Sequence, residues 1–240
     1  MIVEAETTWA RTLTKIDKDD DATKRKIYAS ESYKDAHASF LYLQNHVKPI
    51  LEKVKNGESP DWLKKRLLAI GLKPISALVD ITNYITFDLG RPLHVYDADK
   101  LNGNLSMRLA TDGEKCKTLD EKEYILSSDM VVIADDVKLH GIGGIMGGLD
   151  SSCTMDTTNV FLEVALFDPI CVTKTGRKIN LQSDARFRFE RGIDSTSIDW
   201  GVDKATEMIL ELCGGEASKI TMAGNYEVPC LLYTSPSPRD

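Results

Sequence analysis

The stretch from Leu78 to Asp97 constrains the fold of this chain more than any other, because it predicts a helix, a stop and an extended segment in direct succession. Leu78, Ile81 and Ile85 stand three and four residues apart, which is the spacing of one apolar face of an α-helix. The polar residues Asp80, Thr82 and Asn83 are expected on the other faces. This concentration of polar side chains between apolar ones is typical of a site and not of a linker.

Gly90 and the pair Arg91-Pro92 predict the end of that helix. Glycine readily adopts the left-handed conformation that follows a helix, and proline has no N–H with which to continue one. The residue before a proline is also biased toward an extended conformation. The chain should therefore leave as an extended segment that carries His94 beside a rigid turn.

Alternation of apolar and polar residues predicts several short strands after Asp97. The segments with this pattern are residues 105–110, 116–119, 124–126, 130–134, 137–142 and 160–164. Turn residues such as Asp135-Asp136 separate them, which is typical of an antiparallel meander. We also interpret residues 183–191 as a strand or an extended loop, because arginine alternates with phenylalanine there.

Further segments carry helix signals. Ser59-Pro60-Asp61 combines a capping hydroxyl, a proline at the first helical position and a carboxylate in the first turn, and Gly71 would end this helix. Its buried side is expected to comprise Trp62, Leu63, Leu67 and Ile70. Asp168-Pro169 repeats the cap-then-proline signal, and residues 198–212 form an amphipathic pattern that ends at Gly214-Gly215. Strands and helices separate along the chain enough to favour an α+β fold over a doubly wound sheet.

Composition limits the class of protein and its partners. The chain has 240 residues, of which 42% are hydrophobic, enough for a sizeable core. Lys and Arg number 30 against 37 Asp and Glu, and the net charge of −7 means that any contact with RNA must be local. The five cysteines form no Cys-x-x-Cys pair, so no metal site is predicted. No apolar run reaches the length of a membrane span and the first residues lack signal-peptide features, so we expect a cytoplasmic protein without membrane contact.

The two ends of the chain differ from its middle. Residues 1–58 include a run of charges and match no pattern well, so we expect a segment of uncertain structure that is partly disordered. Residues 225–240 are expected to be a truncated end. Cys230–Asp240 resembles translated sequencing-adaptor sequence and is left out of the fold prediction.

Several ordered sequence blocks carry a family resemblance. They are Lys-Pro-Ile at 73–75, Val-Asp-Ile-Thr-Asn-Tyr at 79–84, Arg-Pro-Leu-His-Val-Tyr-Asp at 91–97, Gly-Gly-Ile-Met-Gly-Gly at 143–148, Leu-Glu-Val-Ala-Leu-Phe-Asp-Pro at 162–169 and Ser-Asp-Ala-Arg-Phe-Arg-Phe-Glu-Arg-Gly at 183–192. Together they resemble the editing domain of the bacterial-type phenylalanine-tRNA ligase beta subunit, over residues 59–224. The resemblance implies a layered β/β/α sandwich, with mostly antiparallel sheet layers and helices packed on one side.

The resemblance also implies the site residues. His94 and Glu163 match the family's editing-site residues, with His94 near the ester and Glu163 accepting the hydroxyl of a bound tyrosyl group. The positions expected to bind substrate are Lys73, Thr82, Asn83, Pro92, Gly147, Ser183 and Ala185. Ser183 replaces the family's threonine and loses a methyl group, while Lys73 replaces arginine and loses the planar fork. Arg186 and Arg188 are expected to contact the acceptor end of the tRNA.

The residues alone support plainer interpretations. Spacing along a strand favours an exposed Glu163 over a buried acceptor, and a lone histidine such as His94 is more often structural than catalytic. The glycines at 141–148 fit a turn as well as a substrate-lining backbone at Gly147, and no Gly-Lys-Ser/Thr follows them that would bind nucleotide phosphates. The alternation around Arg186 and Arg188 fits a half-buried edge strand as well as an RNA contact.

The resemblance implies hydrolysis of tyrosine wrongly attached to tRNA(Phe), with water as the nucleophile because no serine or cysteine elbow is apparent. This fragment would need no cofactor, whereas ATP and magnesium would serve the complete synthetase. The expected partners are the alpha subunit, in a heterotetramer, and tRNA(Phe). The alternative is a noncatalytic RNA-binding or assembly module of the synthetase.

Overall fold

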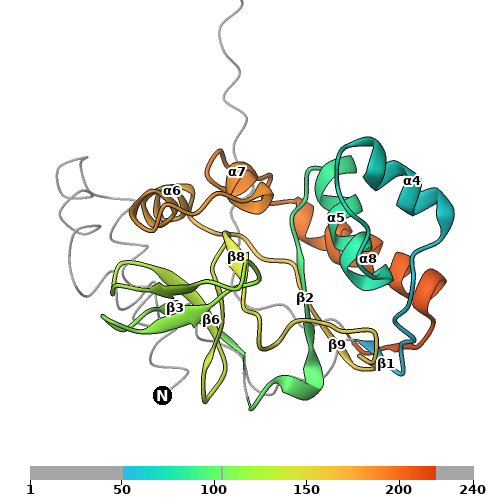
Figure 1. Cartoon of the computed structure of the whole chain (residues 1–240), viewed down its shortest axis with the longest axis horizontal. Coiled ribbons are helices and arrows are strands. Elements are labelled where there is room, and N and C mark those ends of the chain that lie inside the picture. Colours follow the sequence, from blue (N-terminus) through green and yellow to red (C-terminus); the bar gives the residue numbers. More distant parts are fainter. Residues whose placement is uncertain (1–50, 104, 220–240) are drawn as a thin grey trace, which may run out of the picture.

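The computed structural model describes residues 51–103 and 105–219, which fold around two small antiparallel sheets (Figure 1). The first sheet has the order β10-β1-β9-β2, formed by Glu216–Ala217, Leu51–Glu52, Val160–Glu163 and His94–Asp97. The second has the order β3-β6-β7-β8, formed by Ser106–Leu109, Val131–Ala134, Leu139–Ile142 and Met146–Gly147. A separate hairpin of β4 (Lys115–Lys117) and β5 (Glu123–Ile125) lies between β3 and β6 in the sequence, and a 3-10 helix, η1 (Ala98–Lys100), follows β2.

Three helices share a hydrophobic core with the first sheet. They are α4 (Asp61–Ala69), α5 (Ala77–Asp88) and α8 (Ser197–Cys213). Leu78, Ile81 and Ile85 of α5 are fully buried, as the helical spacing predicts. Gly90 follows α5 with a φ of 68°, and the chain then enters β2 as an extended segment.

Two further helices cover the second sheet on the upper side of Figure 1. They are α6 (Pro169–Lys178) and α7 (Asp184–Phe189). Val172 of α6 and Phe189 of α7 share a core with Val132 and Ile142 of the sheet. As predicted, α6 begins at a cap: the Asp168 side chain accepts a hydrogen bond from the N–H of Cys171.

The predicted α+β class is confirmed, with antiparallel sheets and separate helices. The predicted strands at 105–110, 116–119, 124–126, 130–134, 137–142 and 160–164 correspond to β3, β4, β5, β6, β7 and β9. No helix in the described ranges is long and apolar enough to cross a membrane.

The prediction of a strand or extended loop at residues 183–191 is wrong, because Asp184–Phe189 form helix α7. Ser183 caps this helix by accepting from the N–H of Arg186, and Asp184 places a carboxylate in the first turn. In such a short helix the arginine and phenylalanine alternation does not produce two faces of a strand: Phe189 is buried and Phe187 is exposed.

The start of α4 also differs from the prediction. The Ser59 hydroxyl donates to Asp80 Oδ2 at 2.5 Å and does not cap the helix, and Pro60 occupies the cap position. Asp80 was expected to project outward from α5, but it is fully buried. Its carboxylate is satisfied there by this bond and by a second one from the N–H of Ile75. Of the predicted buried side of α4, Leu63 and Leu67 are buried, whereas Trp62 and Ile70 are exposed.

The core begins before the expected boundary at residue 59. Leu51 and Val54 are both buried, and β1 pairs with β9 and β10 inside the first sheet. The expectations for residues 1–50 and for the adaptor-like tail Cys230–Asp240 fall outside the described residues.

Candidate functional site

The two residues named as the centre of the site face each other across neighbouring strands. β2 and β9 pair antiparallel, and in this register His94 lies directly opposite Glu163. Directly opposed residues on antiparallel strands carry their side chains on the same face of the sheet. The sheet therefore brings together an imidazole and a carboxylate that are far apart in the sequence, and each is partly buried.

A third side chain, Tyr96, completes this cluster. It lies two residues after His94 on β2, hence on the same face, and its hydroxyl donates to Glu163 Oε2 at 2.5 Å. The Tyr96 ring is 1% exposed and meets the His94 ring edge-on, with ring centroids 4.5 Å apart. The sequence analysis missed Tyr96, although its two-residue spacing from His94 was a signal once the strand was predicted.

Gly147 closes the site from the second sheet. A Cβ atom at this position would lie 2.3 Å from Cε1 and 2.4 Å from Nε2 of His94, so only glycine fits beside the imidazole. His94 Nε2 is itself buried and has no hydrogen-bond partner among the described residues. Buried polar atoms are usually hydrogen-bonded, so this nitrogen is a candidate ligand-binding or water-binding atom.

Burial sets the protonation states of the cluster. It lowers the pKa of His94 to about 4, so the imidazole is neutral at pH 7. Burial raises the pKa of Glu163, while the hydrogen bond from Tyr96 and the charge of Arg91 act in the opposite direction. The cluster thus places the neutral imidazole of His94 on one strand and the Glu163 carboxyl group, which accepts from a phenol, directly opposite on the neighbouring strand.

A second histidine lies behind Tyr96 and has a different environment. His140 of β7 is 0% exposed, and its Nε2 donates to Asp135 Oδ2 at 2.7 Å. The Tyr96 and His140 ring centroids are 6.3 Å apart. Burial opposes ionisation of Asp135, but hydrogen bonds from His140 and from the N–H groups of Lys138, Asn102 and Val137 lower its pKa to about 2.

Comparison with known proteins identifies the family. The B3/4 domain family matches residues 44–214. The chain belongs to the B3/4 domain family. Its relatives include the phenylalanine-tRNA ligase beta subunit of Mesorhizobium japonicum, 56% identical over 171 residues, which cover 71% of this chain and 21% of that protein. The beta subunit of Paramagnetospirillum magneticum is 57% identical over 175 residues, or 73% of this chain and 22% of that protein.

These matches confirm the resemblance to the phenylalanine-tRNA ligase beta subunit. The chain spans about a fifth of the length of these relatives. A crystal structure of an N-terminal fragment of the phenylalanyl-tRNA synthetase beta subunit from Pyrococcus horikoshii is also similar, at 15% identity. It covers 55% of this chain and 40% of that one with a TM-score of 0.34, and no structural argument rests on it.

In this B3/4 domain, α7 brings a further expected substrate residue close to Gly147. Ser183 Oγ donates to the carbonyl oxygen of Ile145 at 2.5 Å, two residues before Gly147 in the chain. Ala185, the second residue of α7, packs against the second core. The start of α7 is therefore anchored to the segment that carries Gly147.

The other expected substrate residues are more widely spread. Thr82 is buried within α5, where its hydroxyl donates to the carbonyl oxygen of Val79, and Asn83 is partly buried on the same helix. Pro92 is buried two residues before His94. Lys73 lies in an exposed loop between α4 and α5, and no contact within the described ranges joins it to His94 or Glu163.

The two arginines expected to contact RNA have different positions. Arg186 is 3% exposed, donates to the carbonyl oxygen of Leu181 at 2.6 Å and pairs with Glu190 at 3.1 Å, so the structure gives it an internal role. Arg188 is partly exposed and stacks over the Phe87 ring, 4.5 Å from its centroid. No group of acidic, cysteine or histidine residues in the described ranges could hold a metal ion.

Proposed function

We propose that this B3/4 domain hydrolyses the ester that links tyrosine to tRNA(Phe), as the editing domain of a phenylalanine-tRNA ligase beta subunit. One observation carries the proposal: Glu163, which already accepts a phenol hydroxyl from Tyr96, lies directly opposite a neutral His94 with an unpartnered nitrogen. A tyrosyl group differs from a phenylalanyl group only by its phenol hydroxyl, the same chemical group that Tyr96 already donates to Glu163. A buried acceptor for it can discriminate between them, whereas an apolar pocket discriminates poorly.

Glu163 is the proposed reader of the amino acid. Tyr96 occupies Oε2, so the hydroxyl of the tyrosyl group would be accepted by Oε1. The hydrogen bond from Tyr96 fixes the orientation of the carboxyl group before the substrate arrives. A phenylalanyl group in the same position would leave the desolvated carboxylate without this second donor, which disfavours it.

His94 is proposed to orient the attacking water. Its low pKa makes it a weak base, so its contribution is to hold the water by a hydrogen bond at Nε2 and not to store a proton. The water oxygen adds to the ester carbonyl carbon, the bond to the ribose oxygen breaks, and that oxygen leaves with a proton supplied by the water. Free tyrosine and intact tRNA are the products.

The cysteines of the described ranges do not compete with water for the role of nucleophile, because burial raises the pKa of each of them. Burial raises the pKa of Cys116 and of Cys153 to about 12, so both are thiols at neutral pH, and the thiolate is the nucleophilic form. The proposal requires no cofactor in this domain. We assign ATP, magnesium and partnership with an alpha subunit in a heterotetramer to the complete synthetase.

The test is deacylation of tyrosyl-tRNA(Phe) and phenylalanyl-tRNA(Phe) by the chain, against buffer alone. Release of tyrosine well above the buffer rate, with slower release of phenylalanine, is the expected result. Equal rates for both esters would contradict recognition through Glu163. Binding of tRNA without any deacylation would support the alternative, a noncatalytic RNA-binding or assembly module.

A further inference from the structure

Arg91 is a buried cation that makes no direct ion pair within the described part of the chain, although the charge of Glu163 acts on it. Its side chain is 0% exposed, and Nη2 donates to the carbonyl oxygen of Ala165 at 2.6 Å, while Nε and Nη1 have no hydrogen-bond partner. Burial lowers its pKa to about 10, which still leaves it charged at neutral pH. Unpaired buried charges are costly, and native proteins usually pair them or hold a ligand there.

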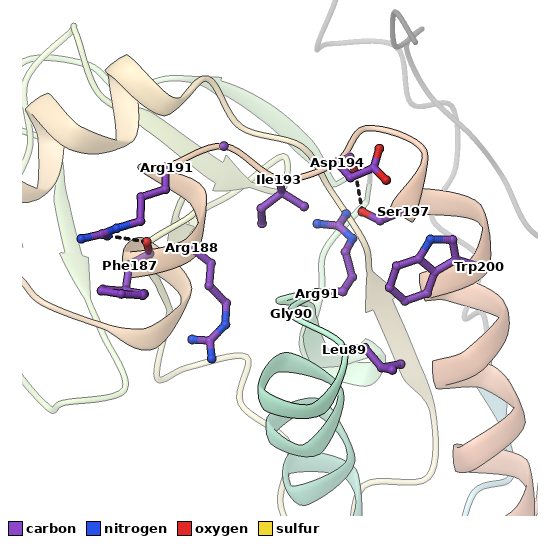
Figure 2. Close-up of a pocket in the computed structure, with 11 residues that line it drawn as sticks. Leu89, Gly90, Arg91, Phe187, Arg188, Arg191, Ile193, Asp194, Ser197 and Trp200 are labelled. Atoms are coloured by element: carbon purple, nitrogen blue, oxygen red, sulfur yellow. Dashed lines mark hydrogen bonds between the residues drawn. The ribbon is translucent and has the colours of Figure 1, made fainter. Parts of the chain in front are cut away.

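Arg91 is one of the residues that line a cavity of about 420 Å³, a volume in the range of small-molecule sites. Figure 2 shows Arg91 between Ile193, Ser197 and Trp200. The cavity is lined by Leu89, Gly90, Arg91, Phe187, Arg188, Arg191, Gly192, Ile193, Asp194, Ser197 and Trp200. Neither His94 nor Glu163 contributes to this lining, and Arg91, on which the charge of Glu163 acts, connects the cavity to their cluster.

The position of Arg91 is fixed before any ligand binds. The bond to Ala165 holds one end of the planar guanidinium. Gly201 of α8 leaves room for the stem, because a Cβ there would lie 3.2 Å from Arg91 Cγ. A guanidinium held in this way loses little conformational freedom on binding an oxyanion with its remaining N–H groups.

The surroundings of Arg91 add positive potential. Arg188 and Arg191 also line the cavity, and the 17-residue helix α8 begins at Ser197 in its wall. Asp194 is the single acid among the described lining residues, and its carboxylate already accepts from the N–H and hydroxyl of Thr196. The cavity is therefore suited to an anion.

An aromatic ring accompanies these charges. Trp200 is 40% exposed on the cavity wall, whereas the Phe187 ring is covered by the Arg191 guanidinium at 3.7 Å. Exposed aromatic rings beside arginines are the combination with which proteins stack bases and neutralise phosphates of single-stranded nucleic acid. A free inorganic phosphate would use Arg91 but not the indole ring.

We propose that this cavity binds one nucleotide of single-stranded RNA, with the phosphate at Nε and Nη1 of Arg91 and the base against Trp200. This inference rests on the proposed function, because that function supplies the RNA partner. It adds a contact outside the His94 and Glu163 cluster, which would hold the RNA strand while the ester is hydrolysed.

Binding of a short single-stranded RNA ending in CCA, measured by fluorescence anisotropy over a range of salt concentrations, tests the proposal. Arg91→Gln and Trp200→Ala should each weaken binding about tenfold. Arg91→Gln should also reduce the salt dependence by about one phosphate contact, whereas Trp200→Ala should leave it unchanged. The matched controls are Arg66→Gln and Trp62→Ala on α4, where Trp62 is 42% exposed; both should bind as the parent chain does.

Trp200→Ala decides the outcome even if Arg91→Gln fails to fold, because Trp200 lies on the surface. Unchanged RNA affinity in Trp200→Ala would overturn the assignment to a nucleotide. Competition by inorganic phosphate at equal strength in the parent chain and in Trp200→Ala would point to a simple phosphate site and would also overturn it.

Deacylation of tyrosyl-tRNA(Phe), measured in parallel, separates this inference from the proposed function. If the parent chain deacylates but both cavity variants bind RNA normally, the nucleotide cavity is wrong and the function stands. If both variants lose RNA affinity while the parent chain shows no deacylation, the cavity is supported and the editing function is wrong.

Discussion

Two histidine rings contact Tyr96, and they differ in how the surrounding residues hold them. His140 has no exposed surface and donates to Asp135, whose carboxylate also accepts three backbone N–H groups. His94 keeps some exposure, and its Nε2 has no partner in the described ranges although Glu163 lies directly opposite. Each imidazole keeps one buried nitrogen without a partner in the described ranges, Nδ1 in His140 and Nε2 in His94. The difference is that His140 is anchored through its other nitrogen to the Asp135 carboxylate, which holds the fold in place, whereas no such anchor ties His94 to Glu163.

The carboxylates show the same contrast. Hydrogen bonds lower the pKa of Asp135 to about 2 in spite of burial, so it is ionised in the folded protein at any ordinary pH. For Glu163 burial prevails over the bond from Tyr96 and the charge of Arg91, and the pKa is raised. Asp135 therefore contributes to stability, whereas the raised pKa of Glu163 is of the kind that is common at functional sites and agrees with the role proposed for it.

The largest effect is expected from a substitution that breaks the Asp135–His140 pair. Asp135→Ala should lower the free energy of unfolding by about 3 kcal/mol, because it leaves buried donors without an acceptor. Urea unfolding measures the change, and Asp156→Ala, at an exposed position, is the control. The preference for tyrosyl over phenylalanyl ester should persist in molecules that remain folded. A loss of preference with unchanged stability would reverse the roles given to the two carboxylates.

Glu163→Ala should cause a loss of discrimination in a chain that still folds, although it leaves the buried Tyr96 hydroxyl without its acceptor and should lower the free energy of unfolding by about 1 kcal/mol. The preference for tyrosyl-tRNA(Phe) should fall by an amount on the order of 1 to 3 kcal/mol, the value of one buried hydrogen bond that is left unmade. His94→Ala should slow both deacylations and leave their ratio nearly unchanged, because the proposed role of His94 is at the ester and not at the ring hydroxyl. The ratio of kcat/KM values for the two esters is the measurement, with Glu207→Ala on α8 as the control. If Glu163→Ala keeps the tyrosine preference, the hydroxyl is recognised elsewhere.

The fold was easier to predict from sequence than this contrast. The spacing of Leu78, Ile81 and Ile85 determines a buried helical face locally, and the glycine and proline that follow determine its end. The helix at Asp184–Phe189 was missed because six residues are too few for periodicity to decide, and only the cap at Ser183 and the acid after it carried the signal.

The site depended on information that no local pattern contains. The pairing of His94 with Glu163 is a register between strands that are distant in sequence, and a shift by one residue would place the two side chains on opposite faces. Family resemblance named both residues but not the bond from Tyr96 or the open donors of Arg91. Arg91 was interpreted only as part of a helix stop, since burial without a partner is a tertiary property.

A methyl group at Gly147 would test, by steric displacement, whether the position of the His94 imidazole matters. Its Cβ would lie 2.3 Å from the His94 ring, so Gly147→Ala should displace the imidazole and slow deacylation of both esters. Overpacking of this kind should lower stability by about 1 to 2 kcal/mol. Gly57→Ala is the matched control, because a Cβ there meets nothing within 4 Å. Full activity in Gly147→Ala would show that the imidazole position is not critical.

The smallest expected effect concerns the Tyr96 hydroxyl, which donates from β2 to Glu163 on β9. Tyr96→Phe removes the donor to Glu163 while keeping the ring, and should lower stability by about 0.5 to 1.5 kcal/mol. The bond from Tyr96 opposes the rise in the Glu163 pKa that burial causes, so its loss should raise that pKa further. Discrimination requires the carboxylate form, which is present above the pKa and is lost as the pH falls through it.

The acid limb of the tyrosine preference should therefore move to higher pH in Tyr96→Phe. Ratios of kcat/KM for the two esters, measured across the pH range in which the enzyme stays folded, give this limb. Tyr124→Phe is the matched control, because Tyr124 also donates to a carboxylate, Asp120, at 2.8 Å, and neither residue contacts Glu163. An acid limb at the same pH in Tyr96→Phe would mean that the pKa of Glu163 does not depend on this tyrosine. It would contradict the proposal that the bond from Tyr96 orients the Glu163 carboxyl group.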